Sequence, residues 1–520
     1  MKLIIPALAL LFTLPPAARA AFLIFPDNSP AARGGVKDAL DAYQRGDFAE
    51  AVKRFRAEAD RGDKEAQFAL GRLYQEGSGV AQSLPRAEEF YRKAAVQGQI
   101  HAQASLAVVL LNSNRTGEAI DWLRKAAKGG APRAMMLLGN LSLTGTGLTK
   151  NTADARQWLE RAAELGDAEA YESLSLMYET GDGVEKNPAK VMELLDKAAQ
   201  RNSVKALLRL AVKSLKGEGT AKDGKKAVGF LTRASALGST DAQTALGSLY
   251  ETGDGVEKKP AEAVVWYTKA SEAGDANAAL KLGVIYSEGA TGVVKDDQKA
   301  MECFQRSAGR GQTVAMFNLG TYYEKGRGVA ANASESIKWH LKSALGGFNL
   351  AQREIGLRYR EGRGLPKDSV AAVSWLGRAA GSGDAAGALA LAEMLLTGEG
   401  GMAPDPKNAI AILTRAAELG LAPAQVRLAE IYASGANGRP DLIRAYALTL
   451  AAGKDFAPGA KLQAELATKM TKEQLADAQK EFQRLKTKPA PTPDKETAPA
   501  APAKQAAPAK QAAPAKAQCR

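Results

Sequence analysis

The side chains that most often perform chemistry are scarce in this 520-residue chain and lie far apart. The chain holds two histidines, His101 and His340, and two cysteines, Cys303 and Cys519. A metal site, or a nucleophile with its base, needs such groups to converge, and their spacing does not bring them together. His340 follows Trp339 at an aromatic position and is expected to be a packing residue. Cys303 is expected to be a small buried apolar residue.

Acidic residues between glycines are the other candidate for chemistry. The phrase YETGDGVEK occurs at 178–186 and again at 250–258, and its GDG raises the question of a calcium loop. The ligand spacing of a calcium loop is absent, and another copy of the phrase reads Gly326-Arg327-Gly328. No phosphate-binding loop or dinucleotide fingerprint is present. We therefore predict no catalytic residue, no cofactor and no metal site, and interpret the phrase as a structural joint.

The joint belongs to a repeat of about 36 residues. In each copy a small residue follows an apolar one and precedes the tyrosine position by three. These small residues are Gly71, Ala107, Gly139, Ser175, Ala211, Gly247, Gly283, Gly320, Gly356, Ala392 and Ala429. A solenoid is the fold that such a period predicts.

Each copy has the pattern of two short helices. In the sixth copy, one apolar stripe at helical spacing runs from Ala242 to Tyr250 and a second runs from Ala263 to Ala270. Between the stripes, Gly253 suits the left-handed end of the first helix, and Pro260 suits the first turn of the second. Val256 is expected to fill the gap between the two helices.

Two further glycines of the sixth copy are expected to mark close helix packing. A glycine leaves room for a neighbouring helix to approach. Gly247 and Gly274 are therefore predicted to lie where helices come unusually near to one another, as is Ala270.

The pattern A-x-x-x-L-G-x-x-Y-x-x-G-x-G-V, followed by A-x-x-W-Y-x-K-A-A-x-x-G, resembles the Sel1-like repeat, a relative of the tetratricopeptide repeat. The resemblance covers about Asp63 to Gly453. It implies an all-α fold: a right-handed α-solenoid of about eleven Sel1-like helix-pair repeats, with helical caps and a disordered C-terminal tail.

The chain is expected to divide into six segments. An apolar run at 3–14 and Ala18-Arg19-Ala20 are typical of a secretory signal peptide, and 486–520 is a low-complexity stretch of Ala, Pro and Lys. The segments are 1–20 signal peptide, 21–36 linker, 37–62 tetratricopeptide-like capping helix pair, 63–453 eleven repeats, 454–485 C-terminal capping helices, and 486–520 disordered tail. We expect an exported, periplasmic protein, or alternatively a secreted one.

The charge of the chain argues against nucleic acid as a partner. The formal net charge is +13, and the tail alone holds seven basic against two acidic residues. Lys2 and Arg19 account for two more charges, which leaves +6 for 21–485, and no basic cluster is evident there. The basic tail could touch an anionic envelope surface, or it could serve only as a solubilising spacer. No later segment approaches 18 consecutive apolar residues, so no transmembrane segment is expected.

The resemblance to tetratricopeptide proteins also implies a binding surface. In those proteins the matching positions of the first helices face the concave groove, where an amphipathic helix or an extended apolar segment can lie. The predicted partner-binding residues are Leu208, Val212, Leu280, Val284, Phe317, Arg353, Leu357 and Arg360. The alternative is that these side chains simply pack against the next repeat.

The resemblance implies a non-catalytic protein–protein interaction scaffold or adaptor in the bacterial cell envelope. A cysteine-rich branch of the family has been associated with β-lactam hydrolysis, but this chain lacks the cysteine pairs of that branch. We therefore predict that the protein is not an enzyme. Two alternatives stay open: a secreted factor that binds a host or neighbouring-cell protein, and an accessory regulator of a cell-wall or exopolysaccharide enzyme.

Overall fold

The computed structural model describes residues 34–436 and 438–487, and within these ranges the fold is all-α. The predicted signal peptide (1–20), nearly all of the predicted tail and Cys519 lie outside the described residues. The chain divides into two compact units, Met1–Ala273 and Gly274–Arg520. Each unit is described by itself.

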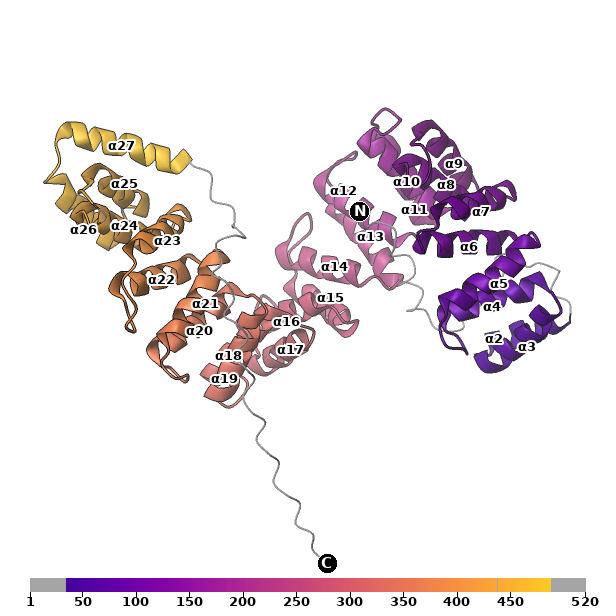
Figure 1. Cartoon of the computed structure of the whole chain (residues 1–520), viewed down its shortest axis with the longest axis horizontal. Helices are drawn as coiled ribbons and strands as arrows, with labels where there is room; N and C mark the ends of the chain where they lie inside the picture. The colour runs from indigo at the N-terminus through magenta and orange to yellow at the C-terminus, as the bar shows by residue number, and fades with distance from the viewer. Residues whose placement is uncertain (1–33, 437, 488–520) are drawn as a thin grey trace, which may run out of the picture. The chain divides into compact units, whose positions relative to one another are not determined.

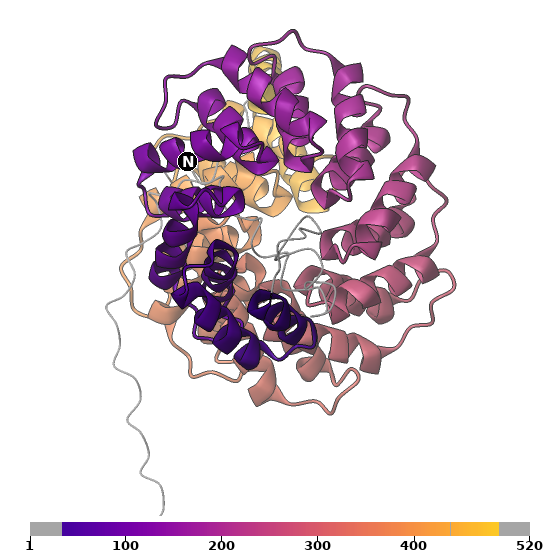
Figure 2. The same ribbon diagram turned by 90° about the vertical axis from the view of Figure 1, so that its right-hand side faces the viewer.

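The two units are built from helix pairs that follow one another in chain order (Figures 1 and 2). The first unit begins with α2 (Gly35–Gln44) and α3 (Phe48–Asp60). Its repeats are formed by α4 (Lys64–Glu76), α5 (Leu84–Val96), α6 (Ile100–Asn112), α7 (Thr116–Lys128), α8 (Pro132–Thr144), α9 (Thr152–Glu164), α10 (Ala168–Thr180), α11 (Pro188–Gln200), α12 (Val204–Lys216), α13 (Gly224–Ala236), α14 (Thr240–Thr252) and α15 (Pro260–Glu272).

The second unit continues the alternation of first and second helices. Its repeats are formed by α16 (Ala276–Glu288), α17 (Asp297–Gly309), α18 (Thr313–Lys325), α19 (Ala333–Leu345), α20 (Asn349–Glu361), α21 (Ser369–Gly381), α22 (Ala385–Thr397), α23 (Pro406–Glu418), α24 (Ala422–Ser434) and α25 (Leu442–Ala452). Two further helices follow among the described residues, α26 (Ala457–Ala467) and α27 (Lys472–Thr487).

The helices begin and end where the residue types require. Asp167 starts α10 by accepting a hydrogen bond from the backbone N–H of Ala170 at 2.8 Å, which satisfies an otherwise unpaired donor of the first turn. Gly253 ends α14 with φ 80° and ψ 22°, a left-handed conformation that glycine adopts without steric cost. Pro260 occupies the first turn of α15. The roles predicted for Gly253 and Pro260 are confirmed.

Gly247 marks a close helix approach, whereas Gly274 does not. A Cβ atom added to Gly247 would lie 2.6 Å from the ring of Tyr267 on α15, but one added to Gly274 would meet nothing within 4 Å. Gly274 has φ 106° instead, a backbone angle that disfavours other residues. The packing role predicted for Gly274 is therefore wrong, and its backbone conformation is the physical reason for glycine there.

The core of each unit is formed by the apolar stripes of neighbouring helices. Leu246, Ala263 and Ala270 are fully buried, and Val256 in the joint packs against the same cluster. Cys303 is buried, as expected, and burial raises the pKa of its thiol to about 11. A thiol in this environment remains protonated and acts as an apolar packing group.

Three stretches depart from the regular repeat. In the seventh repeat the joint closes with an antiparallel bridge between Ala290 and Val293, and the next residue, Val294, is exposed. The shortened second repeat turns at Asn114, which has a positive φ of 59°. Beyond the repeats, α27 packs on α25 and buries Ala478.

Candidate functional site

In the first unit, the predicted partner-binding residues lie on α12. Leu208 is half-buried against the core, whereas Val212 is 48% exposed. Leu176 stands at the corresponding position of the preceding first helix, α10, and is 47% exposed. Sequence reasoning did not select Leu176, although its spacing of 36 residues from Val212 could have revealed it. Two exposed apolar side chains therefore occupy equivalent positions on successive first helices.

In the second unit, the predicted apolar residues are more enclosed. Leu280 and Val284 on α16 are half-buried against a cluster that includes Phe304. Phe317 on α18 lies 5.0 Å, ring to ring, from His340 and 5.4 Å from Phe348. These contacts hold the predicted residues against their own repeats while leaving part of each surface accessible.

The other predicted residues of the second unit lie on α20. Leu357 is half-buried against a neighbouring cluster. The Arg353 guanidinium donates to both carboxylate oxygens of Asp384, at 3.0 and 2.9 Å, and Arg360 donates to Glu399 at 2.8 Å. Both arginines are therefore engaged by carboxylates of the same unit.

Basic residues are concentrated in the fifth repeat, contrary to the expectation that no cluster exists. Residues 204–239 contain eight basic and two acidic residues, whereas 168–203 contain four and seven, and 240–275 contain three and seven. Lys205 on α12 lies 3.2 Å from Glu172 on α10, and Lys213 and Arg209 both pair with Glu179. The acidic fourth repeat thus partly neutralises the basic fifth.

The acidic residue of the GDG joint has a similar role in two repeats. Asp182 accepts a hydrogen bond from Lys150 at 3.2 Å, and Asp254 accepts one from Lys222 at 3.1 Å. In both cases the lysine belongs to the preceding joint. These exposed pairs connect successive joints and contribute little stability individually.

His340 is buried beneath Gly320 on α18 and is 1% exposed. Neither ring nitrogen makes a well-formed hydrogen bond to the described residues. Burial lowers the pKa of the His340 imidazole, and the positive charge of Arg358 lowers it further, while Glu354 and Glu324 oppose the shift. The ring is therefore neutral at pH 7, as a packing residue requires.

We expect acid to destabilise the second unit through His340. Because the folded-state pKa is lowered, the unfolded chain binds the proton more tightly, and stability falls as pH drops below the ordinary histidine value of about 6.5. His340→Tyr removes this loss, so its stability advantage over the parent should grow between pH 7.5 and pH 5. Urea unfolding at both pH values measures the difference.

The tyrosine substitution has a precedent in the chain. Tyr267 stands at the same position of the sixth repeat and donates a hydrogen bond to Glu251 at 2.6 Å. Glu324 occupies the place of Glu251 in the repeat of His340, so the new hydroxyl has an acceptor. An unchanged stability difference across the two pH values would contradict the assignment to His340.

The described residues offer no assembled metal site. Within 34–436 and 438–487, no group of three or more His, Cys, Asp or Glu side chains is placed so that it could hold a metal ion. In the same ranges, no helix has both the length and the apolar character needed to cross a bilayer. His101 lies against Phe68, with 6.2 Å between the ring centroids.

Eleven consecutive segments match the Sel1 repeat family. They are residues 64–99, 101–130, 132–167, 168–203, 204–239, 240–275, 276–312, 313–348, 349–384, 385–421 and 422–454. The chain belongs to the Sel1 repeat family. The family and the all-α repeat fold predicted from the sequence are thereby confirmed. Sel1 repeats commonly mediate protein–protein interactions, and their solenoid is typically a non-enzymatic fold.

Solved Sel1 repeat structures resemble this one. The crystal structure of c5321, described as a protective antigen present in uropathogenic Escherichia coli strains, is 29% identical with a TM-score of 0.53, covering 84% of this chain and 95% of that one. A Sel1 repeat protein from Oxalobacter formigenes is 26% identical with a TM-score of 0.46, covering 74% and 99%.

A curated relative matches over a shorter stretch. NMB1327 of Neisseria meningitidis serogroup B is 34% identical over 105 residues, which is 20% of this Sel1 repeat chain. The match spans 22% of the length of the Neisseria protein.

Proposed function

We propose that this Sel1 repeat protein is a non-catalytic adaptor that is exported to the cell envelope and binds a protein partner on the exposed faces of its first helices. The observation that carries the proposal is the pair of half-exposed apolar side chains, Leu176 and Val212, at equivalent positions of successive first helices. Apolar residues presented in register on adjacent helices suit an amphipathic partner helix. The predicted residues of the second unit form a separate candidate contact on their own helices.

Export and periplasmic location rest on the pattern of residues 1–20. A specific observation favours a second candidate, a secreted factor that binds a host protein. The Escherichia coli structure that resembles this chain is described as a protective antigen, and an antigen that protects must be accessible to the host. Cell fractionation separates the two: recovery from the periplasm supports the adaptor, and recovery from the culture medium supports the secreted factor.

The binding face is tested by a double variant, Leu176→Glu with Val212→Glu. Both side chains are about half exposed, so the fold should tolerate glutamate, whereas burying two charges against a partner is costly. Recovery of the native partner from a cross-linked envelope fraction, quantified by mass spectrometry, is expected to fall at least about tenfold, the equivalent of roughly 1.4 kcal/mol.

A matched control lies on a second helix of the same unit. Val265 on α15 is 47% exposed, so Val265→Glu adds one such charge away from the first-helix faces and should leave recovery unchanged. If the double variant is folded by circular dichroism and still recovers its partner at the parent level, the face is wrongly assigned. The same comparison with Leu280→Glu tests the second unit. Phe317→Glu is a poorer choice because Phe317 packs on His340 and Phe348.

A further inference from the structure

One position of the second helix is aliphatic in most repeats. It is the position seventeen residues after the small residue of a regular repeat, thirteen after it in the shortened second repeat and eighteen after it in the seventh and tenth repeats, which carry an extra residue. Its aliphatic members are Ile120, Met192, Val228, Val264, Met301, Ile337, Val373 and Ile410. Three of these side chains, Ile120, Met192 and Ile337, lie beneath the joint of the next repeat. A Cβ atom added to Gly219 would lie 3.2 Å from Met192, and one added to Gly364 would lie 2.7 Å from Ile337. An aliphatic side chain normally fills this space.

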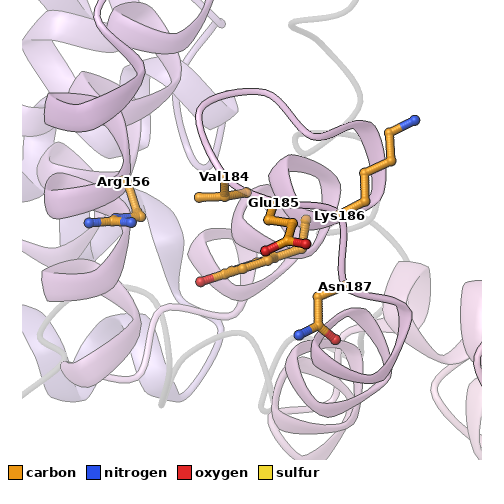
Figure 3. A pocket seen from close by; sticks show the side chains of 6 residues that line it. Arg156, Val184, Glu185, Lys186 and Asn187 are labelled. Atoms are coloured by element: carbon orange, nitrogen blue, oxygen red, sulfur yellow. The ribbon is translucent and has the colours of Figure 1, made fainter.

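The third repeat places Arg156 there instead. A cavity of about 370 Å³ opens at this joint, lined by Arg156, Tyr178, Val184, Glu185, Lys186 and Asn187. Figure 3 shows Arg156 on its helix opposite the loop that carries the residues from Val184 to Asn187, with the Lys186 side chain extending away from Arg156. The pocket is open to solvent and mainly polar, so it suits a small polar group and not an enclosed apolar ligand. The departure from the repeat pattern and the cavity therefore coincide.

Arg156 lacks the charge network that surrounds Glu88, the other charged residue at this position. The first repeat has Glu88 at this position, and Glu88 accepts hydrogen bonds from Arg92 at 2.9 Å and from Arg115 at 2.7 Å. The same two arginines bind Glu118, and the hydrogen bond from Arg92 is the main cause that lowers the pKa of Glu118 to about 2. That four-charge network is closed.

Arg156 has no such network. Its Nε atom is buried and makes no hydrogen bond, whereas the side chain as a whole is 44% exposed, and its paired carboxylate is that of Glu160, 3.6 Å away on the same helix and 47% exposed. A buried N–H group without an acceptor is unfavourable. In place of the usual aliphatic residue, the arginine therefore gains one exposed ion pair, which contributes little stability, and leaves one buried N–H group without a hydrogen bond.

We propose that this cavity binds a carboxylate group, with the Arg156 guanidinium as its counter-ion. The planar guanidinium matches a carboxylate in two parallel hydrogen bonds, and the Tyr178 hydroxyl and Asn187 amide in the wall are further potential donors. Glu185 in the same wall would repel a phosphate, which carries two charges on one group, more strongly than a carboxylate, which carries a single charge on the bound group. The carboxylate belongs either to an acidic side chain of a protein or to a small free acid. The site is independent of the first-helix faces proposed above.

Arg156→Met tests the proposal in the full chain. Methionine is the native residue at this position in two other repeats, Met192 and Met301, so the variant should be at least as thermally stable as the parent. Saturation-transfer NMR should detect binding of N-acetylglutamate α-amide or of succinate to the parent, and an at least tenfold weaker effect with the variant. The uncharged N-acetylglutamine amide should not bind either protein.

The control variant and the two probes decide between the outcomes. Arg124→Met removes an exposed arginine of the same unit, which lies 3.6 Å from Asp121, and should bind both probes as the parent does. Preferential binding of the glutamate derivative identifies a protein side chain as the ligand, and preferential binding of succinate identifies a free acid. Equal binding to the parent and to Arg156→Met, or no carboxylate binding to the parent, overturns the proposal, as does a variant that is clearly less stable.

Discussion

Gly247→Ala is expected to lower the free energy of unfolding of the first unit by about 1–3 kcal/mol, and Gly247→Leu by more, through overpacking. The direction is opposite to helix propensity, because alanine in a helix is about 1 kcal/mol more favourable than glycine. The cause is the ring of Tyr267, whose Cδ1 and Cε1 atoms would lie 2.6 Å from the new Cβ atom. Urea unfolding followed by circular dichroism measures the loss.

A second glycine provides the matched control. Gly229 lies within α13 of the same unit, and an added Cβ atom would meet nothing within 4 Å. Gly229→Ala should therefore stabilise the protein by up to about 1 kcal/mol. If both alanine variants shift stability in the same direction, close packing is not the reason for glycine at position 247.

A rescue experiment makes the packing argument specific to one pair. The fifth repeat has Ala211 and Leu231, both buried, at the positions of Gly247 and Tyr267. Tyr267→Leu alone should cost about 2–3 kcal/mol, through the lost ring and its hydrogen bond to Glu251. The double variant Gly247→Ala with Tyr267→Leu should lose less stability than the sum of the losses of the two single variants. The difference, which is the coupling free energy, should be about 1–2 kcal/mol. Strict additivity would refute the pairing.

The same pairing shows how far sequence reasoning could reach. Regular spacing predicted the helix pairs, the left-handed Gly253 and the contact at Gly247, because each depends on local geometry that every repeat shares. The role of Gly274 was misjudged because a positive backbone angle and a close packing contact are two separate reasons for glycine. The sequence alone does not show which of the two applies at a given position. The division into two units has no periodic signal in the sequence.

The prediction of the binding face combined two positions of the first helix that differ by a small angle around the helix axis. At 100° per residue, the position of Phe317, three before the small residue Gly320, and that of Thr321, one after it, differ by about 40° around the helix. The earlier position borders the core, and its counterparts Phe68 and Met136 in other repeats are buried. The later position includes Leu176 and Val212, both exposed, as well as Val284 and Leu357, which are half-buried. The tetratricopeptide resemblance treats both positions as groove residues, whereas in the structure only the later position includes exposed apolar side chains on successive first helices.

Arg353→Met is expected to destabilise the second unit by about 2–4 kcal/mol, the largest effect among the predicted partner-binding residues. Asp384, the carboxylate that it leaves behind, has a side chain only 4% exposed and also accepts the backbone N–H of Gly387 at the start of α22. Removing the cation leaves a buried charge without its counter-ion, which costs more than the pair itself contributes. Asp384→Asn should cost less, because asparagine keeps the helix cap.

An exposed pair in the same unit sets the scale for that measurement. Arg427 lies 2.8 Å from Glu393, with both side chains about one-third exposed, so Arg427→Met should cost at most about 1 kcal/mol. If Arg353→Met costs no more than this control in urea unfolding, Arg353 is available for a partner and its role in the predicted face is strengthened. If Arg353→Met costs the expected amount, a loss of partner binding in this variant could arise from unfolding as well as from a lost contact. The exposed Leu176 and Val212 are then the residues on which binding can be measured cleanly.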